Sequence, residues 1–348
     1  MKKFLFSVLL CSAILSLNAQ LKTITDLPVI LDNYLYTGNR VVANIIYGGE
    51  GVYEITEGKK LVEVKGNQIV LTEKGEKLIS KKKRIAFSLA TREANGAPAK
   101  TFILLADEFQ KNPVVAHRGA WKHSGMPENS IGALKHAVKL GCAGSEFDVQ
   151  MTSDDSLIIN HDASYKGKNI ESNSFSELAK TNLENGEPLP TLRQYLVAGM
   201  QQQGTKLVLE VKPSDKNRDR ALLRARKIVE LVHSMGAQAW IMYISFDYDI
   251  LKEIRRIDPY AHLQFLNGNK SPLELKADKM DGLDYHFSVF RKNENWIREA
   301  IDNKLALNTW TVNDTPTLQY FLSQKFDFIT TNEPELLFEE WKKATTTK

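Results

Sequence analysis

Cysteine is scarce in this sequence: its 348 residues include two, Cys11 and Cys142. Cys11 lies in an N-terminal apolar segment that we expect to be removed, so that Cys142 remains alone and no intrachain disulfide can form. Packed hydrophobic cores must then stabilise the fold. Because Cys142 lies between a helix-like and a strand-like segment, we interpret it as a small core residue rather than a nucleophile.

A large excess of charge of one sign is also missing. The chain has 46 Lys and Arg against 42 Asp and Glu, which gives a formal net charge of +4. Nucleic-acid binding usually requires a strongly basic face, so we expect no nucleic-acid partner. No feature of the composition indicates an oligomeric state.

The one long apolar run lies at the N-terminus, in MKKFLFSVLLCSAILSLNAQ. Two lysines, an apolar stretch and a small residue, Ala19, are typical of a secretory signal peptide. The stretch from Phe4 to Leu17 is shorter than the roughly 20 residues of a membrane-spanning helix. We therefore predict a signal peptide over residues 1–19, export to the periplasm or the medium, and no stable membrane insertion after cleavage.

Residues 21–110 contain short runs in which apolar and polar residues alternate. The runs are VVANIIY, GVYEI, KLVEV, QIVLT, RIAFSLA and TFILLA, and they are separated by segments such as YGGEG and TEKGEK, which we expect to be turns. This spacing is typical of an antiparallel β-sandwich. We predict a small all-β accessory domain here, in which the run Lys81–Arg84 is a solvated turn.

From residue 112 onward, the pattern changes to alternating strands and helices. Strands are expected at 114–117, 145–150, 206–212, 239–246, 262–266, 282–287, 306–312 and 326–331. About eight parallel strands with covering helices over residues 112–348 predict an α/β TIM barrel. A further run, SLIIN at 156–160, follows the second strand too closely for a parallel crossover and should fold back as a hairpin.

Carboxylates gather at the C-terminal ends of these strands, where TIM barrels place their sites. Glu146 and Asp148 are two positions apart and point to one side of their strand, and Glu210 lies on the next barrel strand. Converging carboxylates lose hydration and repel one another unless a cation offsets that cost. We predict that these three residues bind a hard divalent cation, Ca²⁺ or Mg²⁺. The alternative is a separate salt bridge for each, with Lys212 as one partner.

Two histidines and two cationic side chains lie at the same strand ends. His117 and His161 can carry protons near neutral pH. Arg118 and Lys212 can attract a phosphate and stabilise charge on its oxygens. A metal, two proton carriers and two phosphate-binding cations together favour phosphodiester cleavage.

Two other reaction classes fit these residues less well. No serine or cysteine accompanies a histidine–carboxylate pair, as acyl transfer would require. A glycosidase would use two of the carboxylates but would leave the histidines and the cations without a role.

In their order and spacing, residues 113–334 resemble the glycerophosphodiester phosphodiesterase family. The matching pieces are AHRG at 116–119, PENS at 127–130, EFDV at 146–149, TSDD at 152–155, HD at 161–162, LPTL at 189–192, LEVK at 209–212, WTVND at 310–314 and ITTNEP at 329–334. The last piece departs from the family, which usually has Asp at the position of Asn332. This exchange removes a charge but keeps a hydrogen-bond acceptor.

The resemblance implies a PLC-like phosphodiesterase TIM barrel that hydrolyses glycerophosphodiesters to glycerol 3-phosphate and an alcohol. It implies that Glu146, Asp148 and Glu210 hold a divalent metal, Ca²⁺ or Mg²⁺. It also implies that His117 and His161 are the general acid and base. In that family the glycerol 2-hydroxyl is thought to help attack phosphorus.

The same resemblance suggests residues that contact the small-molecule substrate. Arg118 and Lys212 match phosphate contacts, and Glu128 matches a position near the site. Trp310 would offer an apolar wall for the glycerol carbons, or would be a core aromatic at the barrel mouth.

Two other functions stay open at this point. A phospholipase C-like or D-like enzyme on the same barrel would attack intact lipid or lysolipid, and an apolar rim, for example at HFSVF (286–290), would favour it. A degenerate barrel would instead bind phosphodiesters without cleaving them, but neither histidine is lost. The accessory domain lies outside the family pattern, and we prefer a structural role for it.

Overall fold

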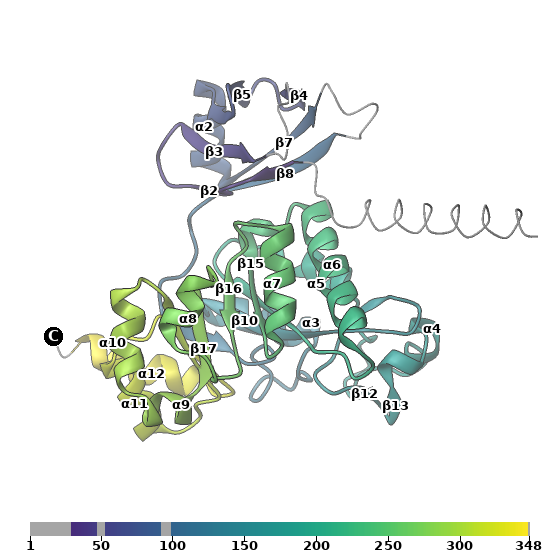
Figure 1. Cartoon of the computed structure of the whole chain (residues 1–348), viewed down its shortest axis with the longest axis vertical. Helices are drawn as coiled ribbons and strands as arrows, with labels where there is room; N and C mark the ends of the chain where they lie inside the picture. Colours follow the sequence, from purple (N-terminus) through teal and green to yellow (C-terminus); the bar gives the residue numbers. More distant parts are fainter. Residues whose placement is uncertain (1–28, 47–52, 92–98, 347–348) are drawn as a thin grey trace, which may run out of the picture.

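The structure, a computed structural model, describes residues 29–46, 53–91 and 99–346. The predicted signal peptide, residues 1–19, lies outside these described residues. Two bodies follow one another along the chain, a small one made of short strands and a larger one in which strands and helices alternate (Figure 1). Among the described helices, none combines the length and the hydropathy that crossing a membrane requires.

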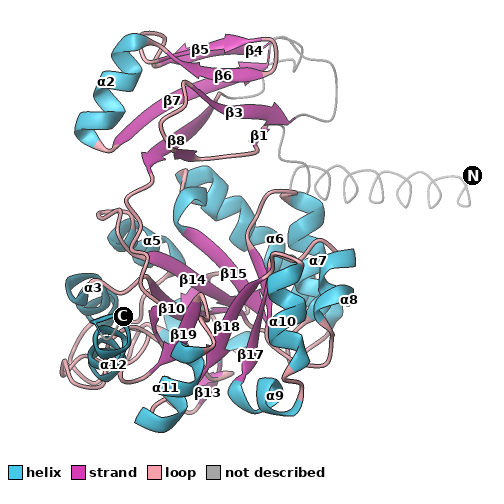
Figure 2. Cartoon of the chain, turned by 90° about the vertical axis from the view of Figure 1, so that its left-hand side faces the viewer, coloured by secondary structure: helices cyan, strands magenta, loops and turns pink. Residues whose placement is uncertain are grey.

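Two four-stranded sheets form the small N-terminal body (Figure 2). One has the order β1-β3-β6-β5 and the other the order β2-β8-β7-β4. The strands are β1 (Ile30–Leu31), β2 (Leu35–Tyr36), β3 (Val41–Ile46), β4 (Tyr53–Glu57), β5 (Val62–Lys65), β6 (Gln68–Leu71), β7 (Arg84–Thr91) and β8 (Lys100–Ala106). The six predicted runs correspond to β3–β8. The β2–β8 pair is parallel, and the other pairs are antiparallel as expected.

One segment of this body differs from the prediction. TEKGEK (72–77), expected to be a turn, is the N-cap and the first half of helix α2 (Glu73–Lys82), whose first turn is capped by the side chain of Thr72. Lys81 and Lys82 form the last turn of this helix rather than a solvated loop, and Lys83 ends it with φ 62°. Ile79 is the large apolar side chain that α2 buries fully, so the segment lacks the repeated apolar positions by which a helix is recognised in a sequence.

Eight parallel strands close into a barrel in the second body, which confirms the TIM-barrel prediction. The order is β10-β14-β15-β16-β17-β18-β19-β9, and β9 pairs back with β10. The strands are β9 (Val114–Ala116), β10 (Gly144–Met151), β14 (Lys206–Val211), β15 (Ile241–Ser245), β16 (Leu263–Phe265), β17 (Gly282–His286), β18 (Ala306–Trp310) and β19 (Phe328–Thr331). Each overlaps a predicted strand. β11 (Leu157–Ile159) pairs antiparallel with β10, as the predicted hairpin requires.

Helices surround the barrel (Figures 1 and 2). They are α3 (Ile131–Leu140), α4 (Phe175–Leu178), α5 (Leu192–Gly199), α6 (Arg218–Met235), α7 (Tyr248–Ile257), α8 (Pro272–Ala277), α9 (Phe287–Lys292), α10 (Asn295–Asp302), α11 (Thr315–Ser323) and α12 (Pro334–Thr346). Two short 3₁₀ helices, η1 (Ile170–Ser172) and η2 (Gln238–Trp240), and the small hairpin of β12 (Ser164–Tyr165) and β13 (Lys168–Asn169) lie in the connections.

The interior of the barrel is apolar next to the site. Val115, Val208, Met242, Ile244 and Leu266 form one buried cluster inside it. Val115 and Val208 each precede a predicted site residue, His117 or Glu210, by two positions. Because side chains two apart share one face of a strand, these site residues point into the barrel immediately beyond the apolar cluster.

The small body docks on the N-terminal end of the barrel. The Lys100 ammonium nitrogen, on β8, lies 3.0 Å from His233 Nδ1, and in the segment between β8 and β9 the backbone N–H of Gln110 donates to the carbonyl of Gly204 at 2.8 Å. His233 lies in α6, which precedes β15, and Gly204 lies just before β14. The contact is therefore at the opposite end of the barrel from the carboxyl ends of the strands.

Candidate active site

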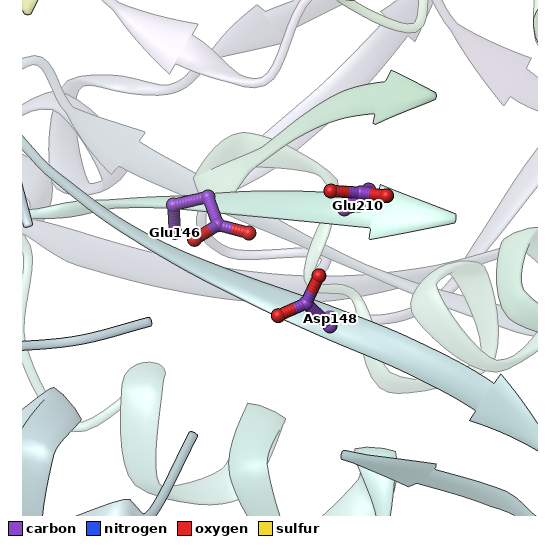
Figure 3. Close-up of side chains that lie close together, drawn as sticks. All are labelled: Glu146, Asp148 and Glu210. Carbon is purple, nitrogen blue, oxygen red and sulfur yellow. The ribbon is translucent and has the colours of Figure 1, made fainter. Parts of the chain in front are cut away.

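Three carboxylates converge at the carboxyl ends of two neighbouring strands (Figure 3). Glu146 and Asp148 lie on β10, and Glu210 lies on β14 in register with Asp148. Each offers an oxygen, and these oxygens all lie within 4.8 Å of one another. The three side chains are buried, so the structure brings together the residues predicted to bind a metal.

Burial and mutual repulsion dominate the electrostatics of this cluster. Burial raises the pKa of Glu146 well above its usual value, and the charges of Asp148 and Glu210 raise it further. Burial, with Asp148, also raises the pKa of Glu210 to about 7. For Asp148, burial opposes ionisation, but Lys212 and other positive neighbours lower its pKa overall. A second cation near the cluster would favour ionisation of all three groups at neutral pH, and an all-oxygen donor set suits a hard divalent ion.

The salt bridges considered as an alternative are present but incomplete. Lys212 Nζ lies 3.2 Å from Asp148 Oδ1 and 2.8 Å from Glu210 Oε1, so one ammonium group serves two carboxylates. Among the described residues, no lysine or arginine forms an ion pair with Glu146, whose Oε2 accepts the backbone N–H of Arg118 at 2.8 Å. The Arg118 guanidinium instead donates to Glu128 at 2.8 Å.

His117 follows β9 and is held by the residue that departs from the family motif. Its Nδ1 lies 2.8 Å from the Asn332 side-chain oxygen. Burial, with the nearby charge of Arg118, lowers the pKa of His117 to about 4. A neutral ring that donates from Nδ1 to this amide oxygen keeps the lone pair on Nε2, which lies 3.9 Å from Glu146 Oε2. The side-chain oxygen of Asn332 thus serves as the hydrogen-bond acceptor that the sequence predicted at this position.

His161 follows β11 and is held differently. Its Nδ1 lies 2.7 Å from the carboxylate of Asp162. The side-chain amide of Gln150, from β10, donates to the carbonyls of His161 and Asp162 at 3.2 and 3.3 Å. This loop is therefore fastened to the strand that carries two of the carboxylates.

The predicted site residues surround one small cavity of about 130 Å³. Its lining includes His117, Arg118, Glu146, His161, Glu210 and Trp310. Asp148 and Lys212 reach it through the contacts above, and Glu128 lines a neighbouring hollow that shares His161. The sequence-predicted residues thus lie together, although they come from segments far apart in the chain.

The backbone turn after β9 explains the glycine of the HRG motif. Arg118 and Gly119 have φ values of 57° and 79°. A Cβ on Gly119 would lie 2.7 Å from the Cβ of Ala133 in α3. A residue without a side chain therefore allows the turn to pack against the helix.

Two residues that the sequence did not assign to the site also support it. Asn129, in PENS, donates to Asp148 Oδ2 at 2.9 Å and accepts the Asp148 N–H at 3.1 Å. Arg224, fully buried in α6, donates to the Lys212 carbonyl at 2.6 Å and to Gln150 at 3.2 Å. The PENS motif is a signal for Asn129, but nothing in the sequence around Arg224 distinguishes it from a surface arginine.

One wall of the cavity is apolar. A further acidic residue, Asp284, also lines the cavity. Ile244, Phe246, Leu266 and Trp310 line the apolar wall, and the Trp310 indole N–H donates to the carbonyl of Asp284 at 2.9 Å. Asp284 lies on β17, and burial, with the charge of Glu210, raises its pKa well above the usual value.

The barrel matches a known family. A sequence model of the Glycerophosphoryl diester phosphodiesterase family matches residues 117–336. The chain is 24% identical over 257 residues to a glycerophosphodiester phosphodiesterase of Caldanaerobacter subterraneus, a match that covers 67% of this chain and 99% of the relative. The small N-terminal body precedes the matched residues of the family model.

Solved structures show the same likeness. The crystal structure of a glycerophosphodiester phosphodiesterase from Parabacteroides distasonis is 38% identical, with a TM-score of 0.65, and the match covers 69% of this chain and 99% of that one. An Oleispira antarctica phosphodiesterase in complex with the product sn-glycerol-3-phosphate shares the fold at 22% identity and a TM-score of 0.56, over 66% of this chain and 96% of that one.

These matches bear on one of the two functions left open by the sequence. A barrel that only binds phosphodiesters is not supported, because the family and the relatives named above are phosphodiesterases. The chain belongs to the glycerophosphoryl diester phosphodiesterase family and is an enzyme of that class.

Proposed function

We propose that this protein hydrolyses glycerophosphodiesters to glycerol 3-phosphate and an alcohol, with a divalent metal and two histidines. The observation that carries the proposal is the buried cluster of Glu146, Asp148 and Glu210, whose oxygens lie within 4.8 Å of one another in a cavity also lined by His117 and His161. The Oleispira phosphodiesterase, with its bound product sn-glycerol-3-phosphate, supports the same choice of product.

The three carboxylates would hold the metal, and their oxygens suit Ca²⁺ and Mg²⁺ alike. A bound divalent cation would offset their repulsion and supply positive charge for the phosphate oxygens. Lys212, which contacts Asp148 and Glu210, would share its charge with the phosphate. Arg118, held by Glu128 and 3.8 Å from Asp148, would contact the phosphate as well.

His117 suits the role of general base. Its neutral ring donates from Nδ1 to Asn332, so Nε2 can accept a proton from the attacking hydroxyl group. If the glycerol 2-hydroxyl attacks, its oxygen bonds to phosphorus while the bond from phosphorus to the leaving alcohol breaks.

His161 suits the role of general acid. The Asp162 carboxylate at Nδ1 can stabilise a protonated ring, as the acid partner of a catalytic pair requires. His161 would give its proton to the departing oxygen. Water would then open the cyclic phosphodiester with the two histidines in reversed roles, which yields glycerol 3-phosphate.

The test is release of glycerol 3-phosphate from glycerophosphocholine and glycerophosphoethanolamine. We expect release with Ca²⁺ or Mg²⁺, loss of release in EDTA, and recovery when the metal is restored. The variant His117→Ala should lose at least about 100-fold in kcat. The control His136→Gln, on α3, keeps a side chain that can donate to the Ala120 carbonyl, which lies 2.9 Å from His136 Nδ1, and should keep wild-type activity. Folded protein that releases nothing with either metal would contradict the proposal.

We also propose that the enzyme is exported and works in the periplasm or outside the cell, on the evidence of the N-terminal sequence alone. The mature chain should then begin at Gln20. N-terminal mass analysis of protein from the periplasm and from the medium tests this, and an uncleaved cytoplasmic chain would refute it.

A further inference from the structure

Asp284 is a buried acid that the proposed mechanism does not use. It lies on β17 with 1% of its surface exposed, and it lines the same cavity as His117, Glu210 and Trp310. Its Oδ1 is buried without a hydrogen-bond partner among the described residues. A buried carboxyl oxygen with no partner costs free energy, so a group that supplies one on binding would be favoured there.

Asp284 faces the metal cluster from across the barrel. The carboxylates of the cluster lie on β10 and β14, and two strands, β15 and β16, separate β14 from β17 in the sheet order. Asp284 is not one of the three residues whose oxygens gather within 4.8 Å. A substrate whose phosphate lies at the cluster would therefore reach Asp284 with its far end.

The space between these two sides is small and has an apolar wall. The cavity of about 130 Å³ has room for roughly four water molecules. Leu266, Phe246 and Trp310 form its apolar wall, and the hydrogen bond from the indole to the Asp284 carbonyl holds the tryptophan beside the acid. A three-carbon polyol fits a space of this size and character.

We propose that Asp284 determines specificity at this site: its carboxyl group binds the terminal hydroxyl of the glycerol moiety, and substrates in which that hydroxyl is missing or acylated lose this contact. This inference rests on the proposed function and names its substrate class. A hydroxyl group both donates and accepts, so it can pair with the carboxyl group in either protonation state. In a lysolipid acylated at that position, the hydroxyl is esterified and its proton is lost.

The test compares three substrates with one headgroup. They are glycerophosphoethanolamine, the matching phosphodiester of propane-1,2-diol, which keeps the 2-hydroxyl and lacks the terminal one, and 1-acyl lysophosphatidylethanolamine. For the wild type we expect kcat/KM to fall roughly 10- to 100-fold from the first to the second, with no measurable cleavage of the third. For Asp284→Ala, the first substrate should fall to the level of the second, which should change little.

Two variants and one binding measurement separate substrate recognition from damage to the fold. Asp284→Asn keeps a side chain that donates and accepts, and it should retain most of the discrimination. Asp302→Asn, an exposed acid on α10, should behave as the wild type. Mn²⁺ titration of Asp284→Ala should give wild-type affinity, because Asp284 lies outside the carboxylate cluster.

Several results would overturn the inference. One is an equal loss on both diesters in Asp284→Ala, and another is a weakened Mn²⁺ affinity, which would make the acid part of the metal site. A wild type that cleaves both diesters equally well, or the lysolipid as fast, would overturn this inference and leave phosphodiester hydrolysis standing. A wild type that cleaves none of the three substrates would overturn the proposed function together with it.

Discussion

At the residue scale, Asn332 favours the neutral form of the His117 ring. Family members usually carry Asp in this position of the final motif, and a carboxylate there would favour a protonated ring. The amide accepts the Nδ1 proton without that charge. With burial as the main cause, the pKa of His117 lies at about 4, below the ordinary histidine value of 6.5. The ring is thus neutral and ready to accept a proton over the whole physiological range.

The pH profile of Asn332→Asp tests this account. A general base must be deprotonated, so at a metal concentration that saturates the carboxylates, protonation of His117 should reduce wild-type kcat/KM near pH 4. The new carboxylate should raise the pKa of His117 by roughly 1–3 units and move the acid limb of kcat/KM to higher pH by the same amount. The control Asn303→Asp adds the same charge at the end of α10 and should leave the limb in place. An acid limb that is the same in both variants would count against His117 as the base.

At the element scale, the turn after β9 positions His117 and Arg118 against α3. Its backbone makes two successive positive φ angles, at Arg118 and Gly119. Gly119 also packs directly on Ala133, so this turn is both conformationally and sterically restricted. Gly125, in the next loop, has φ 73°, but no atom lies within 4 Å of the point that a Cβ would occupy there, which makes it a matched control.

Alanine at these two glycines should separate crowding from backbone strain. Gly125→Ala should lower the unfolding free energy by about 1 kcal/mol, because alanine is strained in the left-handed conformation. Gly119→Ala adds overpacking against α3 and should cost about 3 kcal/mol or more, with a loss of activity because His117 and Arg118 shift. Urea unfolding of both variants measures the difference, and equal losses would mean that the contact with α3 is unimportant.

At the scale of the whole molecule, a partly buried polar network joins the two bodies. Lys100, on β8, contacts His233 at 3.0 Å, and His233 Nε2 lies 2.8 Å from Asp258 Oδ2. Burial lowers the pKa of Lys100 to about 8, with Asp258 opposing the shift. This network lies at the end of the barrel opposite to the catalytic cavity, and we propose that the small body has a structural role.

Replacing Lys100 by methionine should change how stability depends on pH. The pKa of Lys100 is about 8 in the folded chain and 10.5 ordinarily, so the folded state binds the proton less tightly. The wild type should therefore gain roughly 2–3 kcal/mol of unfolding free energy from this group as the pH rises from about 8 to about 10.5, and lose it as the pH falls.

Lys100→Met should lack this rise, while kcat/KM at neutral pH stays unchanged. Lys111→Met removes a lysine whose side chain is 73% exposed and should follow the wild-type curve. Unfolding free energies measured across this range check the prediction. A wild-type slope in Lys100→Met would show that the buried ammonium group is not responsible.

The sequence by itself determined the barrel and the composition of its mouth. Strand–helix alternation is a local pattern, and the carboxyl ends of parallel strands meet at one edge of the sheet. Side chains such as His117, Glu146 and Glu210 could therefore be placed together from their positions in that pattern. The hairpin that carries His161 followed from a connection too short for a crossover.

Only the tertiary structure decided what surrounds those residues. Helix α2 buries one large apolar side chain fully and so carries little periodic signal, and the docking of the two bodies depends on contacts between distant segments. Asn129 donates a hydrogen bond to Asp148, on a different element of the chain. Asp284 lines the same cavity as His117 and Glu210, which come from distant segments. Packing determines which side chains these residues contact, and burial shifts the pKa values of the site. Both are properties of the folded molecule rather than of any local pattern of residues.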